Sequence, residues 1–101
     1  MVDTFDALAD PTRRRIIELL ARRGDLTAGD LANEFDSARP TISRHLRVLR
    51  EAGVVRTRAV AQERYYMLEA AALQKIETWI ARQRQRWALR LRALEEYLED
   101  D

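Results

Sequence analysis

The strongest constraint in this sequence is a stretch from about Ala71 to Tyr97 that contains neither Gly nor Pro. Its apolar residues recur at helical spacing: Leu73, Ile76, Ile80, Trp87, Leu91, Leu94 and Leu98. This spacing predicts one helix over about 71–98, which at 1.5 Å per residue extends about 40 Å. The remainder of the chain, about 70 residues, is too small to cover such a helix. We expect its apolar face, widened by Trp79, to pack on a second copy of the chain or on an N-terminal helix.

The composition narrows the class of protein. A chain of 101 residues has room for one domain. It has no apolar run near the roughly 18 residues of a membrane span and no leader typical of secretion. Because it has no cysteine, disulfides, thiolate metal sites and thiol redox chemistry are excluded. We therefore expect a cytoplasmic protein that has no membrane partner and binds no cofactor.

Charge is segregated along the chain although the net charge is only +1. Residues 1–36 carry five Arg and eight acidic residues, residues 37–64 carry seven Arg and two acidic residues, and the rest is nearly balanced. A basic block in a nearly neutral protein is typical of a nucleic-acid surface. A solvated charged face would give the same count, so the motifs must distinguish the two interpretations.

Start and stop signals predict two helices near the N-terminus. Phe5 and Leu8 lie at helical spacing on a short first helix. Asp10 is a good N-cap, and Pro11 fits the first turn of a second helix because its missing N–H would have no intrahelical partner. We expect this helix to end at Gly24, the residue type favoured for a left-handed cap.

Two more helices are predicted around the basic block. A short third helix ends at Phe35 and begins at a capping box formed by Thr27 and Asp30. We expect Ser37 to cap a fourth helix, in whose first turn Pro40 needs no donor. A strand-like pattern follows over about 54–68 and predicts a β-hairpin. Its tip lacks the Gly or Asn that tight turns favour, which leaves a longer loop or a displaced turn open.

The third and fourth helices form the pattern of a helix-turn-helix, whose second helix enters the major groove of DNA. Arg suits the O6 and N7 atoms of guanine, and hydroxyl groups reach phosphates or base edges. We expect Ser37 and Arg39 to position the helix on phosphate. Thr41, Arg44 and His45 are expected to read bases. The candidate DNA contacts on this helix are Ser37, Arg39, Thr41, Ser43, Arg44, His45 and Arg47.

The segments ALADPTRRRIIELL, LTAGDLANEF, ARPTISRHLRVLREAGVV and ERYYML resemble, in order and spacing, the ArsR-type family of winged helix-turn-helix repressors. The resemblance covers about Phe5–Leu68. It implies a mainly α fold with a small β-hairpin, and a homodimer that places two recognition helices in adjacent major grooves. It also implies that the hairpin is a wing whose basic contacts are Arg56, Arg58 and Arg64.

The resemblance further implies that the dimer pairs through its first and last helices. The Trp-bearing tail resembles that of non-metal, autorepressor-like members. Metal-sensing relatives use Cys on the recognition helix, or His and acidic residues on the last helix. This chain has no Cys and a single His in its recognition helix, so no metal site is expected. The implied interface residues are Phe5, Leu8, Ile76, Trp79, Ile80, Trp87, Leu91 and Leu94.

Several residues allow more than one interpretation. His45 fits a metal ligand, a groove contact or a partly buried residue bonded to a carboxylate. The run Arg13–Arg15 fits either phosphate binding or a helix surface paired with Asp10 and Glu18. Trp79 and Trp87 fit core or dimer packing, or a small-molecule pocket.

The sequence thus favours a DNA-binding transcriptional regulator, acting as a repressor on an inverted-repeat operator as a homodimer. The alternative is a protein-interaction module, such as an antitoxin or anti-regulator, that uses the Trp-bearing helix. An enzyme is not expected, because the chain lacks a glycine-rich phosphate loop and clustered carboxylates beside a base. Whether a small-molecule effector binds at the dimer interface is not decided by the sequence.

Overall fold

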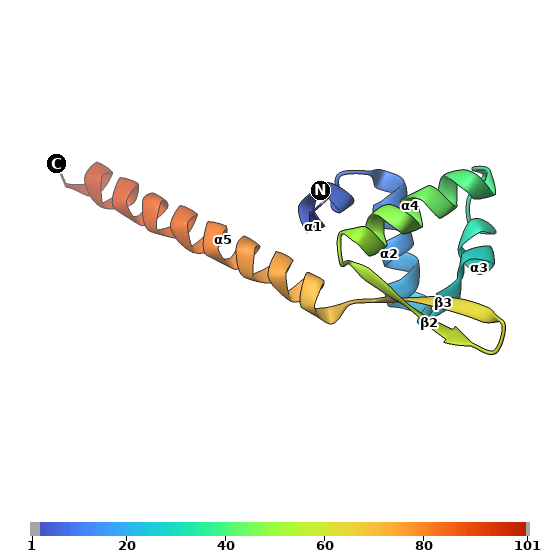
Figure 1. Cartoon of the computed structure of the whole chain (residues 1–101). Helices are drawn as coiled ribbons and strands as arrows, with labels where there is room; N and C mark the ends of the chain where they lie inside the picture. The colour runs from blue at the N-terminus through green and yellow to red at the C-terminus, as the bar shows by residue number, and fades with distance from the viewer. Residues whose placement is uncertain (1–2, 101) are drawn as a thin grey trace.

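The computed structural model describes residues 3–100, which form a winged domain followed by a long helix (Figure 1). The winged domain contains four helices and a three-stranded sheet, and the final helix leaves it as a straight rod. In chain order the elements are α1 Thr4–Leu8, α2 Pro11–Arg23, β1 Leu26–Thr27, α3 Ala28–Ala32, α4 Arg39–Glu51, β2 Val55–Val60, β3 Glu63–Leu68 and α5 Ala70–Glu99.

Most predicted helix boundaries are confirmed by their caps. The Asp10 side chain accepts a hydrogen bond from the N–H of Arg13, and α2 ends at Gly24 with a positive φ of 85°. Thr27 and Asp30 form both hydrogen bonds of a capping box at the start of α3. Helix α3 ends at Ala32, three residues before the predicted end at Phe35.

The prediction that Ser37 caps α4 is wrong. Its N-cap is Ala38, which makes no side-chain hydrogen bond, and the helix begins at Arg39. A cap at Ser37 would normally accept from the N–H two or three residues later, and Pro40 has no N–H to donate. The fixed φ of Pro40 is enough to begin this helix.

The sheet has the antiparallel order β1-β3-β2. The two-residue strand β1, which was not predicted, pairs Leu26 with Tyr66 and Thr27 with Tyr65. Strands β2 and β3 pair from Val55 opposite Leu68 to Val60 opposite Glu63. Only two residues therefore remain in the turn, and the first of them, Ala61, takes a φ of 57°. The hairpin is tight despite having no glycine at its tip.

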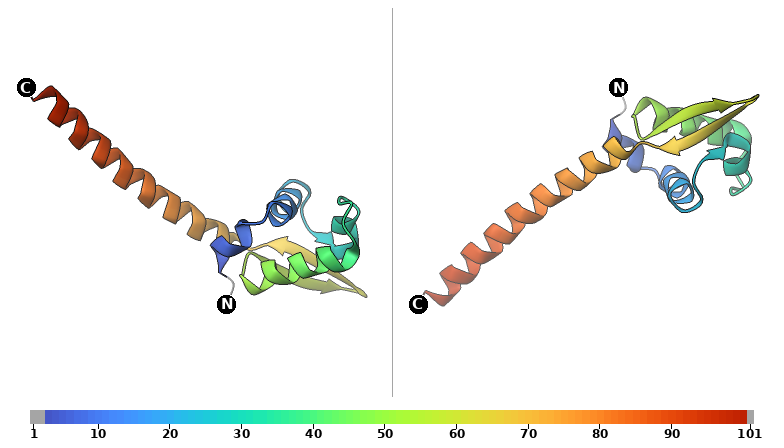
Figure 2. Two further views of the ribbon diagram at one scale, coloured as in Figure 1. Left: turned by 90° about the horizontal axis from the view of Figure 1, so that it is seen from above. Right: turned by 90° about the horizontal axis from the view of Figure 1, so that it is seen from below.

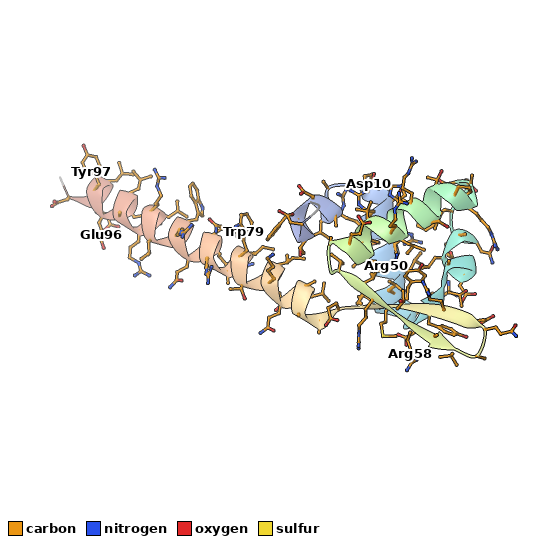
Figure 3. All side chains as sticks on the ribbon, viewed as in Figure 1. Asp10, Arg50, Arg58, Trp79, Glu96 and Tyr97 are labelled. Atoms are coloured by element: carbon orange, nitrogen blue, oxygen red, sulfur yellow. The ribbon has the colours of Figure 1, made fainter. Side chains whose placement is uncertain are left out.

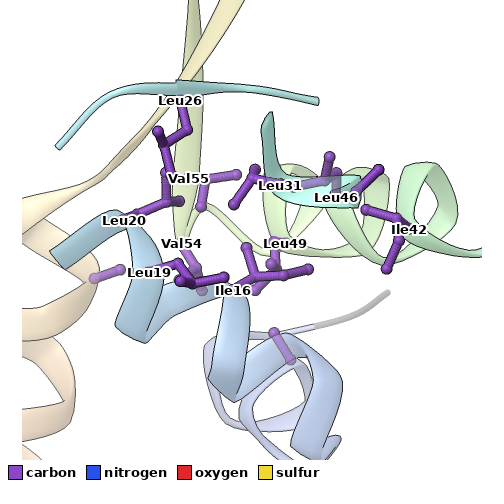
Figure 4. Packing of buried hydrophobic residues seen from close by; sticks show 13 residues of the cluster. Ile16, Leu19, Leu20, Leu26, Leu31, Ile42, Leu46, Leu49, Val54 and Val55 are labelled. Carbon is purple, nitrogen blue, oxygen red and sulfur yellow. The ribbon is translucent and has the colours of Figure 1, made fainter. Parts of the chain in front are cut away.

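The core lies where α2, α3 and α4 meet the base of the sheet (Figure 4). Tyr66 packs against this core, whereas Tyr65 lies on the other face of the sheet and donates a hydrogen bond to Glu63 at 3.0 Å. The largest fully buried side chains are Ile16, Leu31, Ile42, Leu46, Leu49 and Val54.

Helix α5 gives the molecule its elongated shape, 70 × 28 × 26 Å. Views from above and from below show it extending away from the winged domain along most of its length (Figure 2). Near its start, Ala72 is buried and the ring of Trp79 lies 5.4 Å from that of Phe5 in α1. Between residues 3 and 100, no helix is apolar over a sufficient length to cross a membrane.

Candidate nucleic-acid interface

Helix α4 presents its polar face to a groove beside β3. Ile42, Leu46 and Leu49 are buried in the core, which fixes the rotation of the helix about its axis. The polar face and the wing then enclose an open groove of about 640 Å³. Its lining residues, called the arginine groove below, are Pro40, Thr41, Ser43, Arg44, Arg47, Arg50, Arg64 and Tyr66.

The arginine groove contains four of the predicted contacts on α4, namely Thr41, Ser43, Arg44 and Arg47. It also contains Arg50, which was not among the predicted contacts. Arg50 follows Arg47 by three residues, so helical spacing alone could have identified it. Figure 3 shows its side chain on the wing side of α4.

The two predicted phosphate contacts at the start of α4 lie outside the arginine groove. Ser37 is exposed in the segment before the helix. The guanidinium of Arg39 turns back toward α3, where its Nη2 atom is 3.4 Å from the position that a Cβ on Gly29 would occupy. The phosphate contacts predicted for these two residues would therefore lie at the edge of the arginine groove and not inside it.

The three predicted wing arginines lie on two faces of the sheet. Arg64 is opposite Ala59 and lines the arginine groove. Arg56 and Arg58 lie on the other face, because side chains alternate along a strand. There, Arg56 lies 3.5 Å from Glu69 and Arg58 lies 3.1 Å from Asp25. The structure thus brings only one of the three next to the recognition helix.

The side chain of His45, on α4, faces α2 and does not line the arginine groove. Its Nδ1 atom lies 3.3 Å from Nη1 of Arg13 and 3.9 Å from Oδ2 of Asp10, and its side chain is 16% exposed. Since a guanidinium can only donate, this hydrogen bond forms with the tautomer of the ring in which Nδ1 accepts. This placement matches the interpretation of a partly buried histidine beside a carboxylate.

Arg13 and Arg14 bind the end of α1. Arg13 donates through Nε to the carbonyl of Ala7 at 2.7 Å and through Nη2 to that of Asp6 at 3.1 Å. Arg14 donates to the carbonyl of Leu8 at 2.7 Å. The carbonyl of Asp6 also accepts from the N–H of the C-cap Ala9 at 3.1 Å. The arginines thus supply hydrogen bonds to the last carbonyls of α1, which an isolated helix leaves without partners. Both side chains thus have a structural role.

The carboxylate of Asp10 lies beside Arg13 and His45. Burial opposes its ionisation, but hydrogen bonds from the N–H groups of Arg13 and Thr12 and the positive charge of Arg13 lower the pKa of Asp10. The carboxylate therefore stays ionised beside the imidazole. In the described part of the chain, no group of three or more His, Cys, Asp or Glu side chains is arranged to hold a metal ion.

The predicted interface residues divide between α1 and α5. Phe5 and Leu8 are half-buried, and Phe5 packs on Trp79. Ile76 is partly covered. Farther along α5 the apolar side chains are exposed, and Trp87 reaches 61%. These exposed residues are Trp79, Ile80, Trp87, Leu91 and Leu94, to which the structure adds Leu89, Tyr97 and Leu98.

Comparison with known proteins places this geometry in a family. A family described as Helix-turn-helix domain matches residues 8–58. The transcriptional repressor SdpR of Bacillus subtilis (strain 168) is 42% identical over 80 residues, which are 79% of this chain and 88% of that protein.

Two solved structures share the fold. An ArsR-like transcriptional regulator from Rhodococcus sp. RHA1 superposes with a TM-score of 0.83 at 33% identity, covering 96% of this chain and 88% of that one. A crystal structure of another ArsR family transcriptional regulator gives a TM-score of 0.76 at 36% identity, with 84% and 87% covered. Members of this family are DNA-binding regulators and not enzymes. The chain therefore belongs to the ArsR-type family of winged helix-turn-helix regulators and is a DNA-binding transcriptional repressor.

Proposed function

We propose that the protein represses transcription as a homodimer that occupies an inverted-repeat operator through two arginine grooves. The observation that carries this proposal is the lining of the groove, which includes Arg44, Arg47, Arg50 and Arg64 and no acidic residue. Four guanidinium groups on one concave surface match the phosphates and guanine edges of duplex DNA. Repression then follows from excluding other proteins from the operator.

The groove residues divide into base readers and phosphate contacts. Arg44 and Thr41, on the exposed side of the recognition helix, are proposed to read base edges, and Arg47 and Arg50 extend the same face. Arg64, from the wing, is proposed to contact phosphate beside the groove occupied by α4. His45 is proposed to help position α4, because its ring lies beside Arg13 and Asp10.

Pairing through α1 and α5 is proposed to join the two copies. The exposed apolar side chains of α5 need a covering surface, and a second copy provides the same row of side chains. The half-sites would then lie about one helical turn, roughly 34 Å, apart or a multiple of that. The proposed place of action is the cytoplasm, with DNA and a second copy as partners.

The proposed regulator senses no metal. The chain has no cysteine, and its one imidazole already accepts a hydrogen bond from Arg13. In this respect it matches the non-metal, autorepressor-like members that its tail resembles. A small-molecule effector at the α1–α5 junction is compatible with the proposal and not required by it.

Replacement of Arg44 tests the proposed base reading. We expect Arg44→Ala to weaken operator binding by about 1–3 kcal/mol and to relax base preference, as the loss of a bidentate contact to guanine should. The measurement is a mobility-shift titration on the DNA upstream of the gene and on random duplex. Arg22→Ala, which removes the same charge from the far end of α2, is the control. An equal loss on both DNAs would refute the base-reading role of Arg44.

A further inference from the structure

The junction of α1 and α5 holds another open groove, which shares no lining residue with the arginine groove. Its volume is about 440 Å³, within the range of roughly 300–1,000 Å³ that is typical of small-molecule sites. We call it the junction groove. Its lining includes Phe5, Gln74, Lys75, Thr78, Trp79 and Arg82.

Two aromatic rings form the apolar part of the junction groove. The ring centroids of Phe5 and Trp79 lie 5.4 Å apart, and the ring planes are tilted by 59°. Phe5 is half-buried and Trp79 is 50% exposed, so both rings keep surface free for further contact. Figure 3 shows Trp79 on the stretch of α5 that lies beside α1. The aromatic ring of a ligand can pack on both side chains, since tilted and offset contacts are the arrangements that aromatic rings favour.

Positive charge forms the polar part of the junction groove. Lys75 and Arg82 contribute two cations, and no acidic residue is part of the lining. Among the described residues, the ion pairs involve neither of these two side chains. Both cations are therefore available to an anionic ligand. A guanidinium binds a carboxylate or a phosphate through two parallel hydrogen bonds.

The junction groove and the exposed apolar side chains of α5 lie on nearly opposite faces of the helix. Lys75, Thr78 and Arg82 follow one another at spacings of three and four residues, and so share one face. At 3.6 residues per turn, the centre of this face is about 160° from the centre of the apolar face. A second copy that covers the apolar face would therefore leave Lys75 and Arg82 accessible. The apolar face comprises Ile80, Trp87, Leu91 and Leu94.

We propose that the junction groove binds a small organic anion that carries an aromatic ring. The ring packs on Phe5 and Trp79, and the anionic group binds Lys75 and Arg82. An aromatic carboxylate and an aromatic phosphate ester share this chemistry. The proposed repression of transcription does not require the ligand, so the two proposals are tested separately.

Binding of cinnamate, a flat aromatic carboxylate, tests this inference. The protein has two tryptophans, and Trp87 lies eight residues beyond Trp79 and outside the junction groove. In proton–nitrogen correlation spectra, we expect cinnamate to shift the indole N–H signal of Trp79 and to leave that of Trp87 nearly unchanged. A dissociation constant on the order of 1 mM is expected for a ligand of this size.

Two further ligands separate the contributions of charge and of the anionic group. Cinnamamide has the same ring and no charge, and it should bind at least about threefold more weakly than cinnamate. Phenyl phosphate should also shift the Trp79 signal, and the tighter of the two anions identifies the anionic group that the site prefers. Equal binding of cinnamate and cinnamamide would contradict the inference, as would equal shifts of both indole signals.

Substitution of each cation tests the residues assigned to the anion. Lys75→Gln and Arg82→Gln should each weaken cinnamate binding at least about threefold, since each removes one exposed ion pair with the ligand. Arg92→Gln removes the same charge outside the junction groove and should bind cinnamate as the parent protein does. Unshifted indole signals of the ligand-free variants show that the fold is kept.

The inference is wrong if both groove variants bind cinnamate as tightly as the parent protein. It is also wrong if neither anion shifts the Trp79 signal at concentrations well above the expected dissociation constant. A mobility shift on operator DNA without any added anion tests the proposed repression by itself. A protein that binds the operator and neither anion would therefore overturn only the ligand site.

Discussion

Arg13 is the side chain that links the first helix to the recognition helix. Its guanidinium donates to two carbonyls at the end of α1 and contacts the ring of His45 on α4. A helix of five residues is too short to be stable by itself, so α1 depends on such contacts. If α1 contributes to the dimer interface, Arg13 connects that interface with the DNA-reading helix.

The depressed pKa of Asp10 predicts a pH-dependent contribution to stability. A carboxyl with a lowered folded pKa stabilises the fold above its unfolded value of about 3.8 and loses that contribution as pH falls through the folded pKa. Asn caps a helix as well as Asp does but has no charge. Asp10→Asn should therefore lower the free energy of unfolding at pH 7 by about 0.3–1 kcal/mol.

This difference should disappear at pH values well below 3.8, where Asp10 itself is protonated. Urea unfolding at pH 7 and at low pH measures it. The control is Asp36→Asn, which changes an exposed carboxylate between α3 and α4. A loss of stability in Asp10→Asn that is the same at both pH values would show that the charge of Asp10 contributes nothing.

Arg64 and Arg58 allow a controlled comparison within the wing, because the two arginines lie on opposite faces of the sheet. The sequence predicted DNA contacts from both. With Arg64 in the arginine groove and Arg58 beside Asp25, we now expect Arg64→Ala to weaken binding on all sequences. It should also reduce the slope of log affinity against log salt by about one, as the loss of one phosphate contact does.

The same change at Arg58 should leave the salt slope nearly unaltered. Fluorescence anisotropy of labelled duplex across a range of salt concentrations measures both slopes. If Arg58→Ala flattens the slope as much as Arg64→Ala does, DNA contacts the outer face of the wing as well.

At the scale of elements, the hairpin turn of the wing carries a strained residue. Ala61 has a φ of 57°, a conformation that costs a residue with a Cβ about 1–2 kcal/mol and costs glycine little. Ala61→Gly should therefore stabilise the protein by about 0.4–1 kcal/mol after the greater freedom of glycine in the unfolded chain is subtracted. Thermal unfolding measures the change. Ala59→Gly, within β2, should destabilise the protein. A gain in stability from this control as well would contradict the assignment of the effect to the φ of Ala61.

The elements that the sequence predicted correctly are those with local signals. The caps at Asp10 and Thr27 and the long apolar spacing of α5 act within a few residues along the chain, and the structure retains all three. Strand β1 escaped prediction because two residues show no periodicity and pair only after the hairpin has formed. The N-cap of α4 is Ala38 and not Ser37, because the capping signal of Ser37 conflicts with the missing N–H of Pro40.

The sequence predicted which residues of α4 line the candidate site, but it did not predict the contacts that α4 makes with other elements. Helical spacing identified Thr41, Ser43, Arg44 and Arg47, all of which line the groove. The separation of Arg64 from Arg58 depends on the register of β2 and β3, which the length of the turn determines. The contact of His45 with Arg13 joins residues 32 positions apart, and no local pattern indicates it.

At the scale of the whole molecule, the proposed pairing through α1 and α5 constrains the operator. Phe5 of α1 packs on Trp79 of α5, so an interface that includes both helices has its two-fold axis near Trp79. About nine residues of each α5 separate Trp79 from Ala70, or about 14 Å on each side. The two winged domains then begin about 27 Å apart, which is closer to one turn of B-DNA, about 34 Å, than to two turns of about 68 Å.

We therefore expect the tightest binding to an operator whose half-sites are centred about 10–11 base pairs apart. A series of duplexes with half-sites separated by one, one and a half and two turns tests this spacing by mobility shift. The one-turn duplex should bind at least about tenfold more tightly than the one-and-a-half-turn duplex, in which the second half-site faces away from the protein. Preference for two turns would place the dimer axis farther along α5 and would leave α1 outside the interface.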